Sequence, residues 1–177
     1  MRSSTRAVCV WIALGLLVSA VEARQIEVRG KTSSSGGAIT TIDSNGDGIF
    51  ATLSWGSGQD NFGSFTFTGE NEYGIVTGQG ACPAGNVEIP YVQGTSVSIH
   101  STGDQSFTRW EPGAACYNLS TQLMTQHLVG HITGGTGRFA NVTGTVVTEI
   151  TTVTLFSDPS GSFGASTGTY TATLSVP

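Results

Sequence analysis

Residues 131–144, HITGGTGRFANVTG, form the most distinctive segment of this 177-residue chain. Alternation of apolar and polar residues before it predicts a strand that ends near Thr133. Glycines then allow positive φ angles or a close approach to a neighbouring strand, and an aromatic residue returns to the core before a second long strand begins. The segment therefore predicts a hairpin with a glycine-rich corner. Its structural residues are Gly134, Gly135, Gly137, Phe139 and Gly144.

Most of the chain repeats the period-2 alternation of half-buried strands. Near the end of the sequence, Tyr170, Ala172 and Leu174 share one face, and threonines occupy the other. Turn signals such as Asn45-Gly46 separate these runs, and no window has a sustained helical stripe of apolar residues. The pattern predicts an all-β fold of eight to ten short antiparallel strands, arranged as a sandwich or a barrel.

The pattern Gly-Gly-Thr-Gly-x-Phe, with a further glycine at Gly144, resembles the corresponding hairpin of the allene oxide cyclase and dirigent barrel superfamily. The resemblance extends from Leu128 to Val153. It implies an eight-stranded antiparallel β-barrel, calycin-like in form, with a ligand cavity. The plant members are commonly trimers, which implies a homotrimer. The shared hairpin is architectural, so it assigns no catalytic residue to this chain.

The first 23 residues have the features of a signal peptide. Arg2 and Arg6 precede an apolar stretch, and Ala23 ends a suitable cleavage site. The stretch is shorter than the roughly 20 apolar residues of a membrane-spanning helix, and an uncleaved anchor is the alternative. We therefore expect a secreted or extracytoplasmic protein with no membrane attachment after cleavage. Residues 24–38 are predicted to be a flexible N-terminal segment, and residues 39–177 the barrel domain.

Charge and cysteine content fit an exported chain. After residue 23, five basic and eleven acidic side chains give a net charge of −6. With no basic run, such a chain is not attracted to nucleic acid or anionic lipid. Removal of Cys9 leaves Cys82 and Cys116, which predicts a disulfide that stabilises the fold by ~4 kcal/mol in the chain-entropy model. Two free thiols are the alternative.

The sequence offers one weak metal motif. Asp43, Asn45, Asp47 and Gly48 match the first half of a calcium loop. Position twelve of that loop is Ser54 instead of an acid, so a hairpin turn is the favoured interpretation. The remaining residues suggest no metal and no cofactor. In particular, two histidines four apart on a strand would lie about 13 Å from each other, too far to share one ion.

Three polar side chains are the first candidates for chemistry inside a barrel: Arg109, His127 and Glu149. Glu149 lies in mid-strand among valines and threonines, so among the acids it is the first candidate for burial, which would raise its pKa. An outward-facing glutamate on a threonine-rich surface is the favoured interpretation. His100 alternates with Val97 and Ile99, so we expect it on the polar side of its strand.

These features support two hypotheses for function. The first is a secreted barrel that binds a small apolar ligand and steers its cyclisation or isomerisation by holding a reactive conformer, without a cofactor. The second is a non-enzymatic extracellular or envelope interaction module. The content of the barrel interior distinguishes them, because a cavity lined by aromatic side chains favours the first and a fully packed interior excludes it.

Overall fold

The computed structural model describes residues 23–38, 48–158 and 161–177. Within these ranges the chain forms nine antiparallel strands and one short 3-10 turn. In chain order they are β1 Arg24–Ala38, β2 Phe50–Asp60, β3 Gly63–Tyr73, β4 Asn86–His100, β5 Gln105–Trp110, β6 Gly113–Asn118, β7 Leu123–Gly135, η1 Gly137–Phe139, β8 Thr143–Asp158 and β9 Gly161–Val176. The predicted signal peptide and calcium-like turn lie outside the described residues, apart from Ala23 and Gly48.

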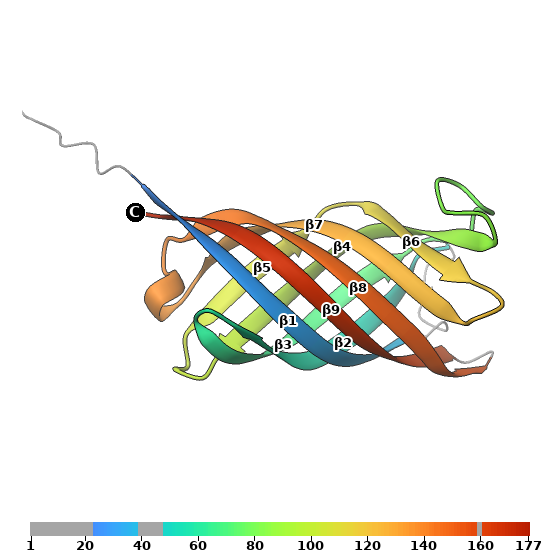
Figure 1. The fold of residues 1–177 in the computed structure, drawn as a ribbon, viewed down its shortest axis with the longest axis horizontal. Helices are drawn as coiled ribbons and strands as arrows, with labels where there is room; N and C mark the ends of the chain where they lie inside the picture. Colours follow the sequence, from blue (N-terminus) through green and yellow to red (C-terminus); the bar gives the residue numbers. More distant parts are fainter. Residues whose placement is uncertain (1–22, 39–47, 159–160) are drawn as a thin grey trace, which may run out of the picture.

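Hydrogen bonds close the strands into a barrel with eight positions (Figure 1). The order is β3-β2-β1-β9-β8-β7-β5-β4, and β4 pairs back onto β3. β5 and β6 share one position, because both lie between β4 and β7, one after the other. Pro112, which has no N–H for the ladder, falls between them. The predicted eight-stranded antiparallel barrel is confirmed.

Residues 24–38 differ from the sequence-based expectation. They form β1, which pairs along its whole length with β9, from Arg24 opposite Val176 to Ala38 opposite Ser162. Its second half also pairs with β2. The run of serines and glycines suggested a mobile linker, but both edges of the strand are hydrogen-bonded to neighbours. The barrel therefore begins at Arg24 and not at residue 39.

The two ends of the barrel differ. We call the end that carries η1 and the turns at residues 61–62 and 101–104 the filled end. Its core is a buried apolar cluster: Val28, Phe139, Val142, Val146, Ala172 and Leu174. The opposite end, which carries the loop at residues 74–85 and the turn at residues 119–122, is the hollow end. A smaller buried cluster of Tyr73, Tyr91, Ala115 and Leu128 lies in its wall.

The glycine-rich corner closes the filled end. Gly134 and Gly137 have φ angles of 140° and 54°, which non-glycine residues rarely adopt. They turn the chain into η1, whose Phe139 is buried in the core of the filled end. Arg138 lies across this corner, with its guanidinium over the Phe139 ring and paired to Asp104. Residues 131–144, the most distinctive segment of the sequence, thus close the filled end of the barrel.

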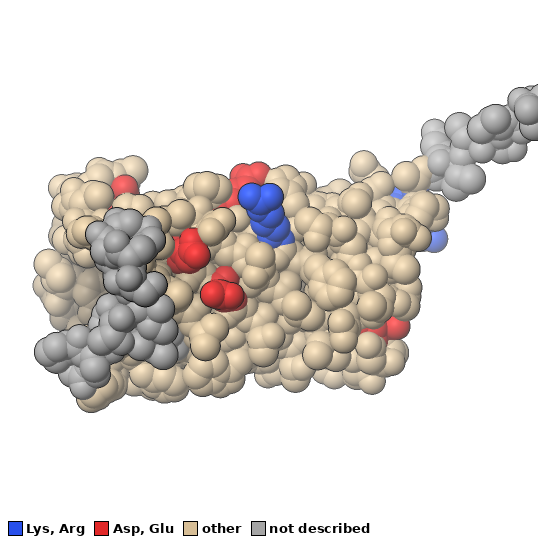
Figure 2. Space-filling model, turned by 180° about the vertical axis from the view of Figure 1, so that it is seen from behind, with Lys and Arg blue, Asp and Glu red and all other residues tan. Residues whose placement is uncertain are grey.

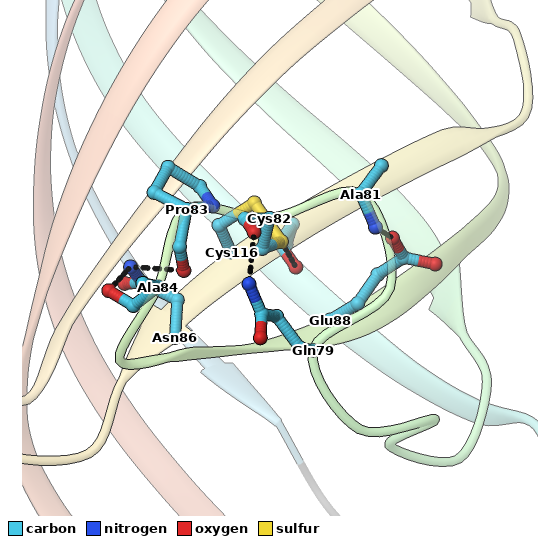
Figure 3. Close-up of a disulfide and its surroundings, with 9 residues drawn as sticks. Gln79, Ala81, Cys82, Pro83, Ala84, Asn86, Glu88 and Cys116 are labelled. Atoms are coloured by element: carbon cyan, nitrogen blue, oxygen red, sulfur yellow. Dashed lines mark hydrogen bonds between the residues drawn. A yellow bond between two sulfur atoms is a disulfide. The ribbon is translucent and has the colours of Figure 1, made fainter.

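The disulfide is located at the hollow end. Cys82 and Cys116 are bonded, which confirms the prediction and joins the loop at residues 74–85 to β6 (Figure 3). Polar contacts shape the same loop, since Gln79 donates to the Cys82 carbonyl and the Ala81 N–H donates to Glu88. A disulfide in the folded chain indicates an oxidising compartment.

The outer surface carries few charges. Figure 2 shows one broad face, where acidic side chains gather beside a basic one and most of the remaining surface is uncharged. Several large apolar side chains are exposed, including Trp55, Ile99 and Phe107. The described residues include no helix with the length and apolar character needed to cross a bilayer.

Candidate functional site

The lumen of the barrel contains two adjacent chambers. The wide chamber, in the hollow end, has a volume of about 740 Å³, and the narrow chamber, toward the filled end, about 130 Å³. Both are bounded by the same five inward-facing residues, which we call the neck: Thr32, Phe67, Ser96, Trp110 and Ile150. Exposed side chains such as Val76 and Leu119 line the other end of the wide chamber, so it reaches the surface at the hollow end.

The wide chamber is hollow because small residues meet in register across four adjacent strands. One row crosses β8, β9, β1 and β2 through Thr152, Ser166, Ser34 and Gly56. The next row, nearer the rim, consists of Thr154, Gly164, Gly36 and Ser54. No side chain in either row is larger than threonine, so this wall cannot reach across the lumen and pack against the opposite wall. Tightly packed interiors need larger groups at such positions.

The opposite wall is aromatic and apolar. Its inward-facing side chains from β3 to β7 include Phe67, Tyr73, Ile89, Trp110, Tyr117 and Met124. Burial raises the pKa of the Tyr73 phenol to about 12, partly opposed by a hydrogen bond from Gln126. The phenol is therefore neutral at ordinary pH. Among the described residues that line the wide chamber there is no Asp, Glu, Lys, Arg or His.

Trp110 fixes the neck between the chambers. Its indole lies over Gly130 of β7, where a Cβ atom would come within 2.6 Å of the ring. The indole N–H donates to the Ser96 hydroxyl at 3.2 Å. A glycine beneath the ring and a hydroxyl at its polar edge together hold the indole in one orientation. Trp110 is thus in contact with the space on both sides of the neck.

The narrow chamber contains an aspartate, a tyrosine and a histidine. Tyr170 donates to the Asp60 carboxylate at 2.6 Å, and the backbone N–H of Phe62 donates to the other carboxylate oxygen at 2.7 Å. Burial raises the pKa of the Tyr170 phenol above its ordinary value, and the neighbouring Asp60 raises it further. Gly30 makes room for this phenol, because a Cβ there would lie 2.4 Å from the ring.

His100 is the other ionisable group of the narrow chamber, and only 5% of it is exposed. Its ring packs between Phe65 and Phe139, with centroid separations of 5.4 and 4.6 Å. Burial lowers the pKa of the imidazole, although Asp60 opposes that shift. The Nδ1 atom is buried and has no hydrogen-bond partner among the described residues. His100 lies on the polar side of β4, as expected. That side of the strand faces the lumen and not the solvent.

The candidates chosen from the sequence lie elsewhere. His127 and Glu149 face outward on adjacent strands, where His127 Nδ1 and Glu149 Oε1 are 2.5 Å apart and both side chains are more than half exposed. Arg109 is also exposed, in a cross-strand row with Glu70 and His131. None of the three candidates lines either chamber. Glu149 thus has the outward-facing orientation that the sequence favoured, and Thr148 and Ile150, the residues before and after it, line the lumen instead.

The sequence missed the residues that do line the lumen. On β2 the apolar residues Leu53 and Trp55 are about half exposed, and the polar residues Thr52 and Ser54 line the chamber. Asp60 ends the same inward-facing series at even positions of β2. The available signal was this alternation, since one inward-facing residue fixes the direction of all the others.

Metal ligands do not gather in the described part of the chain. No group of three or more His, Cys, Asp or Glu side chains there could bind an ion together. The candidate residues of the calcium-like turn, Asp43, Asn45 and Asp47, are outside the described residues.

Comparisons with known proteins add little to this geometry. No protein-family model and no curated protein matches the chain. Among solved structures, the chain is similar to an acetoacetate decarboxylase-like enzyme from Sphingomonas wittichii RW1, with 7% identity and a TM-score of 0.27 over 85% of this chain and 90% of that one. A similarity of that size carries no argument about function, so the site has to be interpreted from its own residues.

Proposed function

We propose that the chain is a secreted, disulfide-bonded barrel that binds a small, largely apolar molecule in its wide chamber. The observation that carries the proposal is the chamber of about 740 Å³ with a rim open to the surface. Small-molecule pockets have volumes of about 300–1,000 Å³ and mostly apolar linings with a few polar groups. A barrel built only as a rigid module would have large side chains in the rows that here contain serine, threonine and glycine.

Export fits the same function. The disulfide favours an oxidising environment, and the predicted signal peptide would deliver the chain there. A ligand carrier outside the cell needs an enclosed apolar chamber, because water surrounds the protein on all sides. The disulfide lies at the hollow end, where it supports the loop next to the opening.

The resemblance of residues 128–153 to the allene oxide cyclase and dirigent barrels suggests that the ligand is also converted. In the wide chamber such a conversion would depend on shape, because the part of its lining that the structure describes includes no charged side chain and no histidine. Confinement of a flexible molecule in a reactive conformer is a recognised source of rate enhancement. If proton transfer takes part, Asp60 and His100 in the narrow chamber are better placed for it than Arg109, His127 and Glu149.

One observation favours the second candidate function, an interaction module. A cross-strand row on the outer wall joins Trp55, Thr68, Val97 and Phe107, and Ile99 lies in the next row. Large exposed apolar patches commonly mark protein contacts. This surface would also serve the homotrimer that the family resemblance implies. A monomeric mass in native mass spectrometry would contradict the trimer without affecting ligand binding.

The experiment for ligand binding is native mass spectrometry of the exported protein purified from its own host, followed by thermal shift with a panel of lipids and phenols. We expect a co-purified small molecule or at least one stabilising compound. Ser166→Phe, which places a ring in the chamber, should reduce the shift, whereas Thr167→Phe on the exposed outer face should leave it unchanged. Absence of any bound molecule and of any shift in the wild-type protein contradicts the proposal.

A further inference from the structure

The two walls of the wide chamber have different chemistry. Four adjacent strands, β8, β9, β1 and β2, supply a hydroxyl wall: Thr152, Thr154, Ser162, Ser166, Ser34 and Ser54. The aromatic wall faces it from β3 to β7. A ligand in this chamber therefore meets hydroxyl groups along one side of its length and rings along the other.

Three polar groups on the aromatic wall already have partners within the protein. The Tyr73 hydroxyl accepts from Gln126 at 2.6 Å, and the Trp110 indole donates to Ser96. Asn71 accepts from the Tyr91 hydroxyl at 2.8 Å. These contacts orient the side chains of this wall and leave mainly carbon surface for a ligand.

The hydroxyl wall keeps hydrogen-bonding capacity. The Thr152 and Ser166 hydroxyls contact each other at 2.8 Å, which uses one donor and one acceptor of the pair. A hydroxyl group offers one donor and two acceptor lone pairs, so this pair can still bond to another group. A purely hydrocarbon ligand would cover these hydroxyls without replacing the water they lose.

Charge is the third constraint on the ligand. A carboxylate or ammonium held inside the wide chamber would lose its hydration and find no side chain of opposite charge among the described residues that line it. Beyond the neck, the carboxylate of Asp60 would repel an anion.

We infer that the ligand of the wide chamber is an uncharged molecule with hydroxyl or carbonyl groups along one side and an apolar face along the other. The inference rests on the proposed function, and it narrows "small and apolar" to a two-faced neutral molecule. The apolar face lies on the aromatic wall, and the oxygen atoms face Thr152, Ser166 and their neighbours.

Three matched probes test this inference. Methyl cholate is neutral and has its hydroxyl groups on one face, cholate has the same hydroxyl groups with a negative charge, and methyl cholanate is neutral without them. Binding is measured at about pH 8, where a carboxylic acid is ionised. Trp110 is the reporter in a Trp55→Phe background, where it becomes the single tryptophan of the exported chain. We expect methyl cholate to bind at least tenfold more tightly than either of the other two.

A pair of double variants links the result to the hydroxyl wall. Thr152→Val with Ser166→Ala removes both hydroxyls and should weaken methyl cholate binding about tenfold, as expected for the loss of one or two hydrogen bonds. The matched control, Thr151→Val with Thr167→Ala, changes the exposed neighbours on the same strands and should leave the affinity unchanged.

The outcomes separate this inference from the function on which it rests. Equal affinity for the three probes, tightest binding of cholate, or no effect of the inner double variant overturns the inference. If none of the three binds while the lipid and phenol panel contains a stabilising compound, the inference is likewise overturned and the binding function stands. If nothing in either set binds, both are contradicted.

Discussion

The filled end and the hollow end are built from the same strands, yet only one of them is packed. Toward the filled end, β8, β9 and β1 place Val146, Ala172 and Val28 opposite one another, and all three are buried. Toward the hollow end the same strands place Thr152, Ser166 and Ser34 opposite one another. The fold requires neither large nor small inward-facing side chains, because the backbone pairing of these strands is continuous through both ends. Side-chain volume along these three strands therefore decides where the barrel interior is packed and where it leaves an open chamber.

The largest expected difference between the ends is in the cost of removing an aromatic ring. Phe139→Ala removes a buried aromatic side chain from the core of the filled end and should lower the free energy of unfolding by about 3–5 kcal/mol. Phe50→Ala at the hollow end should cost less, because one side of that ring faces the chamber. Urea unfolding of both variants measures the difference. Equal losses would contradict the division into two ends.

The disulfide offers a second way to test the comparison. Replacing both Cys82 and Cys116 with serine should lower the free energy of unfolding by about 2–4 kcal/mol. The bond lies at the hollow end, so we expect faster amide hydrogen exchange first in β6 and the loop at residues 74–85. Exchange in β1 and β9 near the filled end serves as the internal control. A uniform increase along the chain would show that the two ends open together.

Added volume should have opposite effects at the two ends. Ala172→Leu forces a larger side chain into a packed cluster and should destabilise the protein by about 1–3 kcal/mol. Ser166→Leu places the same side chain in the wide chamber, where there is room, and should be neutral or slightly stabilising. Thermal unfolding of the two variants measures both effects. A marked loss with Ser166→Leu would mean that the chamber is less open than its volume indicates.

The smallest expected effect concerns pH and the filled end alone. Burial lowers the pKa of His100 below its ordinary value of 6.5, with a smaller opposing influence of Asp60. Below about pH 6.5 the unfolded chain therefore binds a proton that the folded chain does not, so the free energy of unfolding falls as the pH falls and levels off below the folded-state pKa. His100→Phe should flatten this part of the profile. An unchanged slope in urea unfolding across pH 7 to pH 5 would contradict the assignment.

The sequence predicted the antiparallel strands because strands and turns have local signals, and the resemblance of residues 128–153 favoured a barrel over a sandwich. Residues 131–144 encode a corner whose positive φ angles at Gly134 and Gly137 require glycine. The cysteine pair was also accessible, because two cysteines in an exported chain leave a single intramolecular pairing. The β1 strand was missed because serine and glycine are common in linkers, and only its partners β2 and β9 show that it is a strand.

The chamber could not be predicted for a different reason. On β2 and in the second half of β4 polar residues such as Ser54 and Ser96 line the chamber, and apolar residues such as Trp55 and Ile99 point outward. A rule that apolar faces are buried assigns these two segments the wrong orientation. Arg109, His127 and Glu149 were chosen because they carry charge within a strand, and no local pattern indicates which side of a closed sheet such a residue faces. The direction follows only from the register of the whole ring.

One consequence follows from the pairing of Arg24 with Val176. The first and last strands of the barrel begin and end side by side at the filled end, away from the opening of the chamber (Figure 1). A linker, affinity tag or fusion partner attached at either of these positions would leave the entrance unobstructed. Protein immobilised on a sensor surface through either end should present its opening to the solution, and joining residue 176 to residue 24 through a short peptide should preserve every strand pair.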